Sequence, residues 1–221
     1  MNTSQPESIA IIIPAFNEAV TIATVVRNAT SMGHVIVVND GSSDATEREA
    51  KIAGATVLTL PVNQGYENAL TLGMQFAVES NFAFALTMDA DGQHCHKSAK
   101  QLIATIHRCD IAIGIRRKKQ RVAEYIGGWI GSRLWGINDP FSGLKLYRLD
   151  TCKKLGNFDT RKLVGAEMFV RAHRSGLTLL GIPIDTVERA DVPRFGGSLR
   201  ANLKIARATV LLIGISLGLI Q

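Results

Sequence analysis

Five short apolar runs in the first half of the chain alternate with stretches of helical character, and this alternation limits the fold more than any other feature. Short apolar strands separated by helices are typical of a parallel sheet that is buried on both faces. We therefore expect an α/β fold with a mainly parallel central sheet flanked by helices. The expected strands are residues 9–13, 35–38, 55–60, 84–88 and 110–115, and the expected helices are residues 18–31, 44–53, 66–80 and 97–107.

Polar residues stand where three of these runs end. In an open parallel sheet the carboxyl ends of the strands share one edge, and ligands bind in the crevice along it. We therefore expect a ligand site at this edge. Asn17-Glu18 also precedes an expected helix, and Asp44 with Glu47 has the spacing of a capping box. The three polar segments are residues 14–18, 39–44 and 89–94.

The third segment begins with Asp89-Ala90-Asp91. Residues i and i+2 of an extended chain face the same side, so both carboxylates emerge together where the strand ends. Such oxygens can hold Mg²⁺ or Mn²⁺ against a diphosphate, where the cation neutralises charge on a departing phosphate. Aspartates are also common at turns and helix starts, which is the alternative interpretation of the pair.

The chain has the size of one globular domain, with 221 residues of which 46% are apolar. We expect a domain over residues 9–198, a polar tail over 1–8 and a C-terminal helix over 199–221. Three cysteines without CxxC spacing argue against a disulfide framework and favour a reducing compartment. The tail lacks the pattern of a signal peptide, so we expect the protein on the cytoplasmic side of a membrane.

The positive charge of the chain is concentrated in one segment. The formal net charge is +6, and residues 116–121 carry five positive charges, so the charge without them would be +1. Such a cluster is typical of a site for phosphates, an anionic membrane surface or nucleic acid, or of a solvated loop. Nucleic acid is the weaker interpretation, because no stacking aromatic residues are interleaved with the charges.

Apolar residues at helical spacing run along the C-terminus and predict an amphipathic to apolar helix. Its apolar end is shorter than the roughly 20 residues that a membrane crossing needs. The helix could therefore lie on a membrane surface, pair with a second copy or a membrane partner, begin a longer hydrophobic region, or pack on the core. The stripe consists of Leu199, Leu203, Ala206, Val210, Ile213, Leu217 and Ile220.

Taken together, the ordered motifs of the chain resemble the inverting nucleotide-sugar glycosyltransferases with the GT-A fold. The motifs of the second half resemble the branch typified by dolichyl-phosphate mannosyltransferase, which glycosylates polyprenyl phosphates. The resemblance covers residues 9 to about 200. It is carried by residues 13–18, 38–46, 63–65, 89–94, 139–148, Glu167 and 194–198.

The resemblance implies a donor site for a nucleotide-diphosphate sugar. Asp89 would orient the metal or the sugar, Asp91 would ligate Mg²⁺ or Mn²⁺, and Gln93 would be a third oxygen ligand. A softer metal on His94-Cys95-His96 is the less favoured alternative, because the flanking oxygens suit a hard ion. The residues that would cradle the nucleotide are Pro14, Asn17, Glu18, Asp40 and Asp89.

The resemblance also implies a polyprenyl-phosphate acceptor, whose ionised oxygen needs orientation more than deprotonation. Asp139 or Glu167 would orient the sugar, or act as a base if the acceptor is an alcohol. In binding the diphosphate, Arg189 or Arg200 could take the place of Arg194. Residues expected to bind the acceptor or the diphosphate are Arg116, Arg117, Arg133, Ser142, Arg194 and Ser198, while Lys118, Lys119 and Arg121 would meet lipid headgroups.

Two other functions are compatible with parts of the pattern, and a third is disfavoured. The acceptor could be a saccharide hydroxyl on a growing glycan, which would require a base. The chain could instead be a non-catalytic nucleotide-sugar-binding subunit of a membrane complex, although the two aspartates of the Asp-x-Asp segment speak against it. A nicotinamide dehydrogenase is disfavoured, because no G-x-G-x-x-G follows the first strand.

Overall fold

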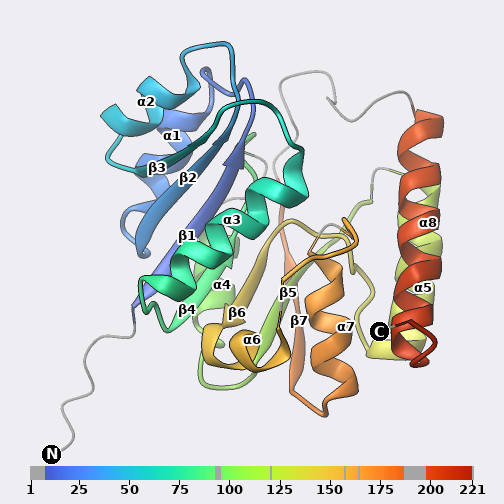
Figure 1. The fold of residues 1–221 in the computed structure, drawn as a ribbon. Helices are drawn as coiled ribbons and strands as arrows, with labels where there is room; N and C mark the ends of the chain where they lie inside the picture. The colour runs from blue at the N-terminus through green and yellow to red at the C-terminus, as the bar shows by residue number, and fades with distance from the viewer. Residues whose placement is uncertain are drawn as a thin grey trace, which may run out of the picture.

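The computed structural model describes residues 8–92, 96–119, 121–156, 158–163, 165–186 and 198–220. Within these ranges a seven-stranded sheet has the order β3-β2-β1-β4-β6-β5-β7, with helices on both faces (Figure 1). The predicted α/β class is confirmed, and all five predicted strands form. The strands are β1 (Ile9–Ala15), β2 (His34–Asp40), β3 (Thr56–Leu60), β4 (Phe84–Thr87), β5 (Ile111–Arg116), β6 (Lys145–Arg148) and β7 (Leu179–Ile184).

Strand β6 runs antiparallel to both of its neighbours, whereas the other pairings in the described sheet are parallel. Lys145 at the start of β6 pairs with Thr87 at the end of β4 and with Ile113 of β5. The turn that leads into β6 therefore lies at the carboxyl edge of the parallel strands. This brings the segment 139–143 next to the Asp-x-Asp segment.

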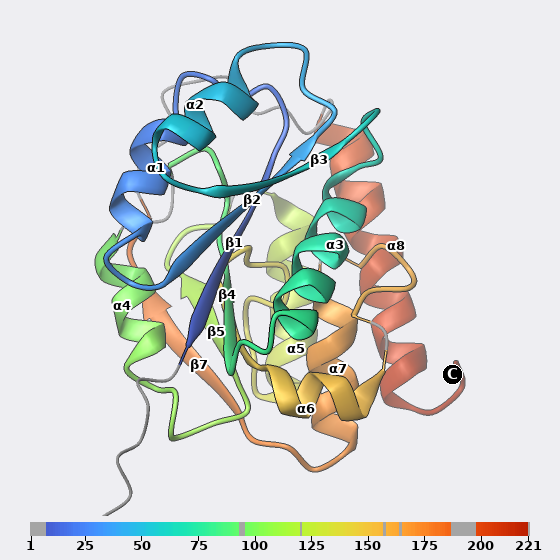
Figure 2. The ribbon, with the colours of Figure 1, turned by 60° about the vertical axis from the view of Figure 1, so that its left-hand side comes forward.

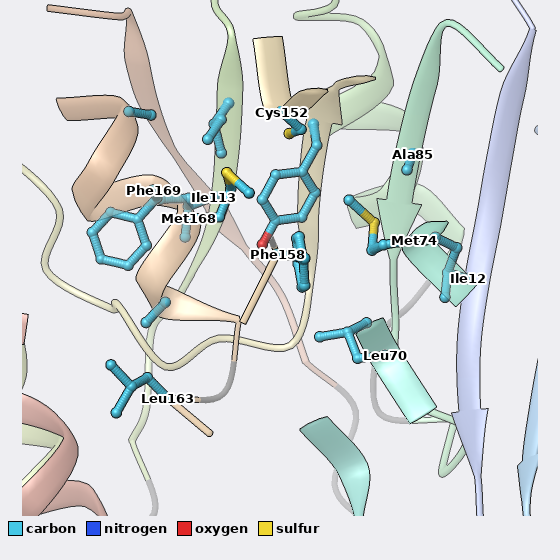
Figure 3. Close-up of a cluster of buried hydrophobic side chains, with 14 of the residues drawn as sticks. Ile12, Leu70, Met74, Ala85, Ile113, Cys152, Phe158, Leu163, Met168 and Phe169 are labelled. Atoms are coloured by element: carbon cyan, nitrogen blue, oxygen red, sulfur yellow. The ribbon is translucent and has the colours of Figure 1, made fainter. Parts of the chain in front are cut away.

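Two hydrophobic clusters cover the two faces of the sheet, beneath the helices that Figure 2 shows on either side of it. Successive residues of β1 show the division, since Ile12 packs with α3 and Ile11 packs with α1. Figure 3 shows Leu70 and Met74 of α3 in the same buried cluster as Ile12 of β1. One face carries α1 (Ile22–Ala29), α2 (Thr46–Ile52) and α4 (His96–Ile103), and the other carries α3 (Tyr66–Glu79), α6 (Leu149–Leu155) and α7 (Ala166–Arg174).

Two helices start later than the capping signals predict. The Glu18 carbonyl accepts hydrogen bonds from the amides of Thr21 and Ile22, so the chain makes a turn before α1 begins at Ile22. Helix α2 begins at Thr46, whose amide donates to Asp44 Oδ1. Glu47 forms an ion pair with Lys51. The predicted capping box is therefore wrong, because the charge partner one turn ahead holds the glutamate.

Helices α5 (Val122–Trp135) and α8 (Ser198–Ser216) stand side by side at one end of the sheet (Figures 1 and 2). Helix α5 is in close contact with the turn before β6 through glycines. A Cβ atom on Gly128 would lie 2.2 Å from the carbonyl oxygen of Asn138, and one on Gly131 would lie 2.3 Å from that of Ile137. The small residues thus let the turn approach the helix backbone directly.

The predicted apolar stripe of the C-terminal helix is not the face that packs. Leu203 is 62% exposed and Val210 is 68% exposed, whereas Ala208 and Leu212 are buried. Small side chains let α8 lie close to α5 and α7. No helix in the described part of the chain is both long and apolar enough to cross a membrane. Of the remaining stripe residues, Leu199, Ala206 and Leu217 are exposed and Ile213 and Ile220 are partly buried.

The glycine face of α5 can be tested with Gly131→Ala. Alanine is normally the better helix residue by about 1 kcal/mol. Here its Cβ would collide with the Ile137 carbonyl oxygen, so we expect the free energy of unfolding to fall by about 1–3 kcal/mol. Urea denaturation measures the change, with Ser132→Ala on the exposed side of α5 as the control. A stabilised Gly131→Ala protein would contradict the close contact.

Candidate active site

Asp40 at the end of β2 shapes the loop before α3. Its side chain is buried, and its two carboxylate oxygens accept hydrogen bonds from the amides of Gln64, at 2.7 Å, and Gly65, at 2.9 Å. Gly65 is the residue before α3 and has a φ of 94°, which favours glycine. Asp40 therefore fixes the point where α3 enters the carboxyl edge of the sheet.

The loops after β1 and β2 are joined by hydrogen bonds. Asn17 has a left-handed φ of 53°, its amide donates to Ser42 Oγ, and its Oδ1 accepts from the amide of Ser43. The Glu18 amide donates to Thr46 Oγ1, and its carboxylate accepts from Thr21 Oγ1. Pro14 is buried at the end of β1. The structure thus brings Pro14, Asn17, Glu18 and Asp40 to one edge, as predicted from the strand ends.

Asp89 lies directly after β4 in a tight setting. The hydroxyl of Tyr66 on α3 donates a hydrogen bond to Asp89 Oδ1 at 3.3 Å. Burial and the charge of Asp89 raise the pKa of Tyr66, so its hydroxyl keeps the proton that it donates. Both carboxylate oxygens lie 2.5 Å from where a Cβ atom on Gly143 would be. The turn before β6 and the start of α3 therefore fix the direction of this carboxylate.

Asp91 follows two residues later and is partly buried, while Gln93 lies outside the described residues. Within the described ranges, no group of three or more His, Cys, Asp or Glu residues could by itself hold a metal ion. A donor set of two carboxylates fits a hard cation, because the remaining positions are open to diphosphate oxygens and water. Asp89 and Asp91 together therefore suit a Mg²⁺ or Mn²⁺ ion that substrate and water also ligate, rather than a structural metal ion enclosed by protein ligands alone.

Arg116 and Asp139 form a buried, two-pronged ion pair between the end of β5 and the turn before β6. The Nε and Nη2 atoms of Arg116 donate to the two oxygens of Asp139 at 2.8 and 2.9 Å, and the Arg116 amide donates at 3.1 Å. Arg116 Nη2 also lies 3.7 Å from Glu124, which pairs with Arg121 at 3.2 Å. Burial by itself would lower the pKa of Arg116, but the bonds and charge of Asp139 raise it above its ordinary value.

The other predicted anion-binding residues have separate surroundings. Arg117 is exposed and pairs with Asp185 at 3.1 Å, whereas the guanidinium of Arg133 lies over the ring of Trp129 at 5.5 Å. Ser142 is fully buried, and its Oγ accepts from the amide of Leu144. The structure therefore gives each of the three predicted arginines a different partner. Arg194 and the side chain of Ser198 lie outside the described residues.

Glu167 at the start of α7 is fully buried and anchors the preceding loop. Its oxygens accept hydrogen bonds from the amide and hydroxyl of Thr160, from the amide and Nη1 of Arg161, and from Nη2 of Arg171. With 0% of its surface exposed and five protein donors around it, this carboxylate presents no surface to a substrate in the described structure. This geometry argues against the predicted role of Glu167 as a sugar contact or a base.

Three residues of the site were missed by the sequence reasoning. Tyr66 and Gly143 hold Asp89, as described above, and Lys145 is only 2% exposed. Burial lowers the pKa of Lys145 to about 8, against the attraction of nearby carboxylates. Lys145 stands between two leucines in a strand, a pattern that ordinarily indicates a solvent-facing side chain. A signal was present in the motif that ends at Gly143, because a glycine in a polar turn favours close backbone contact.

Comparisons with known proteins identify the family of this chain. Residues 10–154 match the family model described as glycosyl transferase family 2. An uncharacterized protein of Methanocaldococcus jannaschii is 30% identical over 205 residues, which are 85% of this chain and 84% of that protein. An undecaprenyl-phosphate mannosyltransferase of Micrococcus luteus is 27% identical over 202 residues, which are 80% of this chain and 83% of the relative.

A solved structure shows the same fold. Glucosyl-3-phosphoglycerate synthase of Mycobacterium tuberculosis, crystallised with Mg²⁺ and uridine diphosphate, superposes with a TM-score of 0.77 at 19% sequence identity. The match covers 96% of this chain and 80% of that one. At this level of identity the likeness establishes the architecture, and the chemistry of the site is argued from its own residues.

The contact between Gly143 and Asp89 yields a prediction about cation binding. Gly143 is not one of the described glycines with a positive φ. Gly143→Ala therefore adds a methyl group without backbone strain. The methyl would push the Asp89 carboxylate aside, and we expect Mn²⁺ to bind about tenfold more weakly. Calorimetry with Mn²⁺ and a nucleoside diphosphate measures this. Tyr66→Phe, which removes only one hydrogen bond, should have a smaller effect, and unchanged affinity in Gly143→Ala would rule out the proposed constraint.

Proposed function

Because this chain belongs to glycosyl transferase family 2, we propose that it transfers one sugar from a nucleotide-diphosphate sugar to a polyprenyl phosphate. The transfer would invert the anomeric carbon, depend on Mg²⁺ or Mn²⁺, and take place at the cytoplasmic face of a membrane. The observation that carries the proposal is the contact of Asp89 with Gly143, in the turn whose Asp139 holds Arg116. Asp91 follows Asp89 by two residues. A cation site and a fixed arginine at one sheet edge suit a reaction between two phosphate-bearing substrates.

In the donor half, we assign the nucleotide to the loops after β1 and β2. Pro14, Asn17, Glu18 and Asp40 line this edge, and carboxylate oxygens suit the hydroxyl and N–H donors of a ribose and a base. Asp91, with Asp89 and Gln93, would hold the cation. Bound there, the cation would neutralise charge on the departing diphosphate. Asp89, held by Tyr66 and Gly143, would keep one direction as the donor sugar approaches.

In the acceptor half, Arg116 is the best-positioned anion-binding residue. Asp139 engages its Nε and Nη2 atoms, which fixes the plane of the guanidinium at the end of β5. We assign Asp139 to orienting Arg116. An ionised phosphate oxygen is already a nucleophile, so this acceptor needs no base. Further phosphate contacts are assigned to Arg117, Arg133, Arg194 and Ser198, whereas the fully buried Ser142 would shape the turn before β6.

A membrane-facing surface would supply the lipid acceptor. Helices α5 and α8 lie side by side and both expose large apolar side chains. Trp129 is 64% exposed, and Lys119 and Arg133 lie against the rings of Tyr125 and Trp129. Aromatic rings with adjacent cations suit the boundary between lipid headgroups and acyl chains. We define the α5–α8 face as Val122, Tyr125, Ile126, Trp129, Leu199, Leu203, Val210 and Leu217.

The reaction is tested by incubating the protein with polyprenyl phosphate in membranes, labelled donor sugars and Mn²⁺, followed by lipid extraction. We expect label in the lipid fraction, its loss with a chelator, and a fall of about 100-fold or more in Asp91→Asn. Asp150→Asn, on a distant side chain that is 80% exposed, is the matched control. Label found only in free sugar or in water-soluble glycan would overturn the lipid-phosphate acceptor.

The membrane surface is tested by flotation with vesicles of anionic or neutral phospholipid. Replacing Trp129 with serine removes a large apolar contact, so partitioning should drop about tenfold, and binding should be stronger to anionic vesicles. Val20→Ser serves as the control, because Val20 is 89% exposed and lies in the loop between β1 and α1, outside the α5–α8 face. If Trp129→Ser leaves vesicle binding intact but breaks a dimer in sedimentation, the α5–α8 face belongs to a second copy.

A further inference from the structure

Lys145 is a buried cation in the middle of the sheet. It begins β6 and lies between Thr87 of β4 and Ile113 of β5. Its side chain is 2% exposed and is among the largest fully enclosed side chains of the described residues. Lysine is almost never buried to this extent unless it is paired, because removing an ammonium group from water is costly. The position of Lys145 therefore requires compensation by neighbouring groups.

Three carboxylates supply this compensation, and Arg116 opposes it. Asp139, Asp159 and Asp89 all attract the ammonium group of Lys145. They come from three different segments, namely the turn before β6, the loop before α7 and the end of β4. Thr87 Oγ1 donates to the carbonyl oxygen of Gly143 and ties two of these segments together. Lys145 therefore lies where the donor and acceptor halves of the site meet.

Each carboxylate also has partners of its own. Asp159 accepts amide hydrogen bonds from Leu163 and Gly165. Asp139 holds Arg116, as described above, and Asp89 accepts from Tyr66. Further contacts join the surroundings of Lys145: its strand partner Thr87 bonds the Gly143 carbonyl, and Gly143 lies against Asp89. On the acceptor side Asp139, which attracts Lys145, holds Arg116. Attraction to Lys145 from both sides disfavours movement of the Asp89 and Asp139 carboxylates.

Resting on the proposed function, we propose that Lys145 is a positioning residue that holds the carboxylate of Asp89 on the donor side and that of Asp139 on the acceptor side. With so little exposed surface, Lys145 acts through these carboxylates and does not touch substrate. Its loss would leave neighbouring negative charges in a poorly solvated region, and the Asp89 carboxylate would turn away from its partner Tyr66.

A double-mutant cycle tests the inference, using Lys145→Met, Asp89→Asn and the combined protein. The readouts are the affinity for Mn²⁺ with uridine or guanosine diphosphate, and kcat and KM for transfer. We expect Lys145→Met to weaken Mn²⁺-nucleotide binding about tenfold, with little further loss when it is added to Asp89→Asn. Lys145→Arg, which keeps the charge, should restore part of the affinity.

Two results would overturn the role. If Lys145 acted on the bound cation only by direct charge repulsion, Lys145→Met would bind Mn²⁺ more tightly, because a repulsive charge has been removed. If its role were only structural, the losses from Lys145→Met and Asp89→Asn would multiply. Lys153→Met, at a partly exposed lysine on α6, is the matched control.

Folding and the proposed function are checked separately. Thermal unfolding is recorded for each protein, and Lys145→Gln replaces Lys145→Met if the latter does not fold. Failure of both to fold would also overturn the inference, because Lys145 would then be required for the fold itself. If wild-type protein binds Mn²⁺-nucleotide but labels no lipid, the acceptor assignment fails while the binding cycle still decides the role of Lys145. If it binds no nucleotide, both proposals fail.

Discussion

The antiparallel insertion of β6 between β4 and β5 is the constraint on which the site depends. In a wholly parallel sheet, the turn before β6 would lie at the edge opposite the Asp-x-Asp segment. The reversed direction places Gly143 against Asp89 and Asp139 against Arg116. The hydrogen bonds of the ladder, together with the bond from Thr87 Oγ1 to the Gly143 carbonyl, fix the register. A shift by one residue would turn Lys145 to the other face of the sheet.

Charge compensation then decides which side chains can act. Asp139 is satisfied by Arg116, and Glu167 by Thr160, Arg161 and Arg171, so neither carboxylate is placed as a base. Asp91 is only partly buried and lies beyond the end of β4. In the proposed reaction, this leaves the Asp-x-Asp pair to meet the cation. A phosphate acceptor suits such a site because its oxygen carries the negative charge before the reaction begins.

The fold and the donor edge could largely be predicted from the sequence, because parallel strands and their polar ends leave local patterns. Other features depend on contacts between distant segments. Nothing near Lys145 in the sequence shows that carboxylates of three separate segments attract it. The partners of Glu167 likewise include a loop residue and a residue one helical turn ahead. The packing face of α8 was missed because alanines such as Ala208 add little to an apolar stripe, although they allow the closest approach.

The two substrates would reach the site from different sides. The loops that we assign to the nucleotide lie at the ends of β1 and β2, whereas helices α5 and α8 lie at the other end of the sheet, beyond β5 (Figure 1). Arg121, at the start of α5, pairs with Glu124, which in turn lies near Arg116. A lipid phosphate drawn along the basic segment would therefore meet Arg116 before it met the donor. The ion pairs that hold Arg116 would thus set the direction from which the acceptor oxygen attacks the sugar. Inversion requires that this direction be opposite to the departing diphosphate.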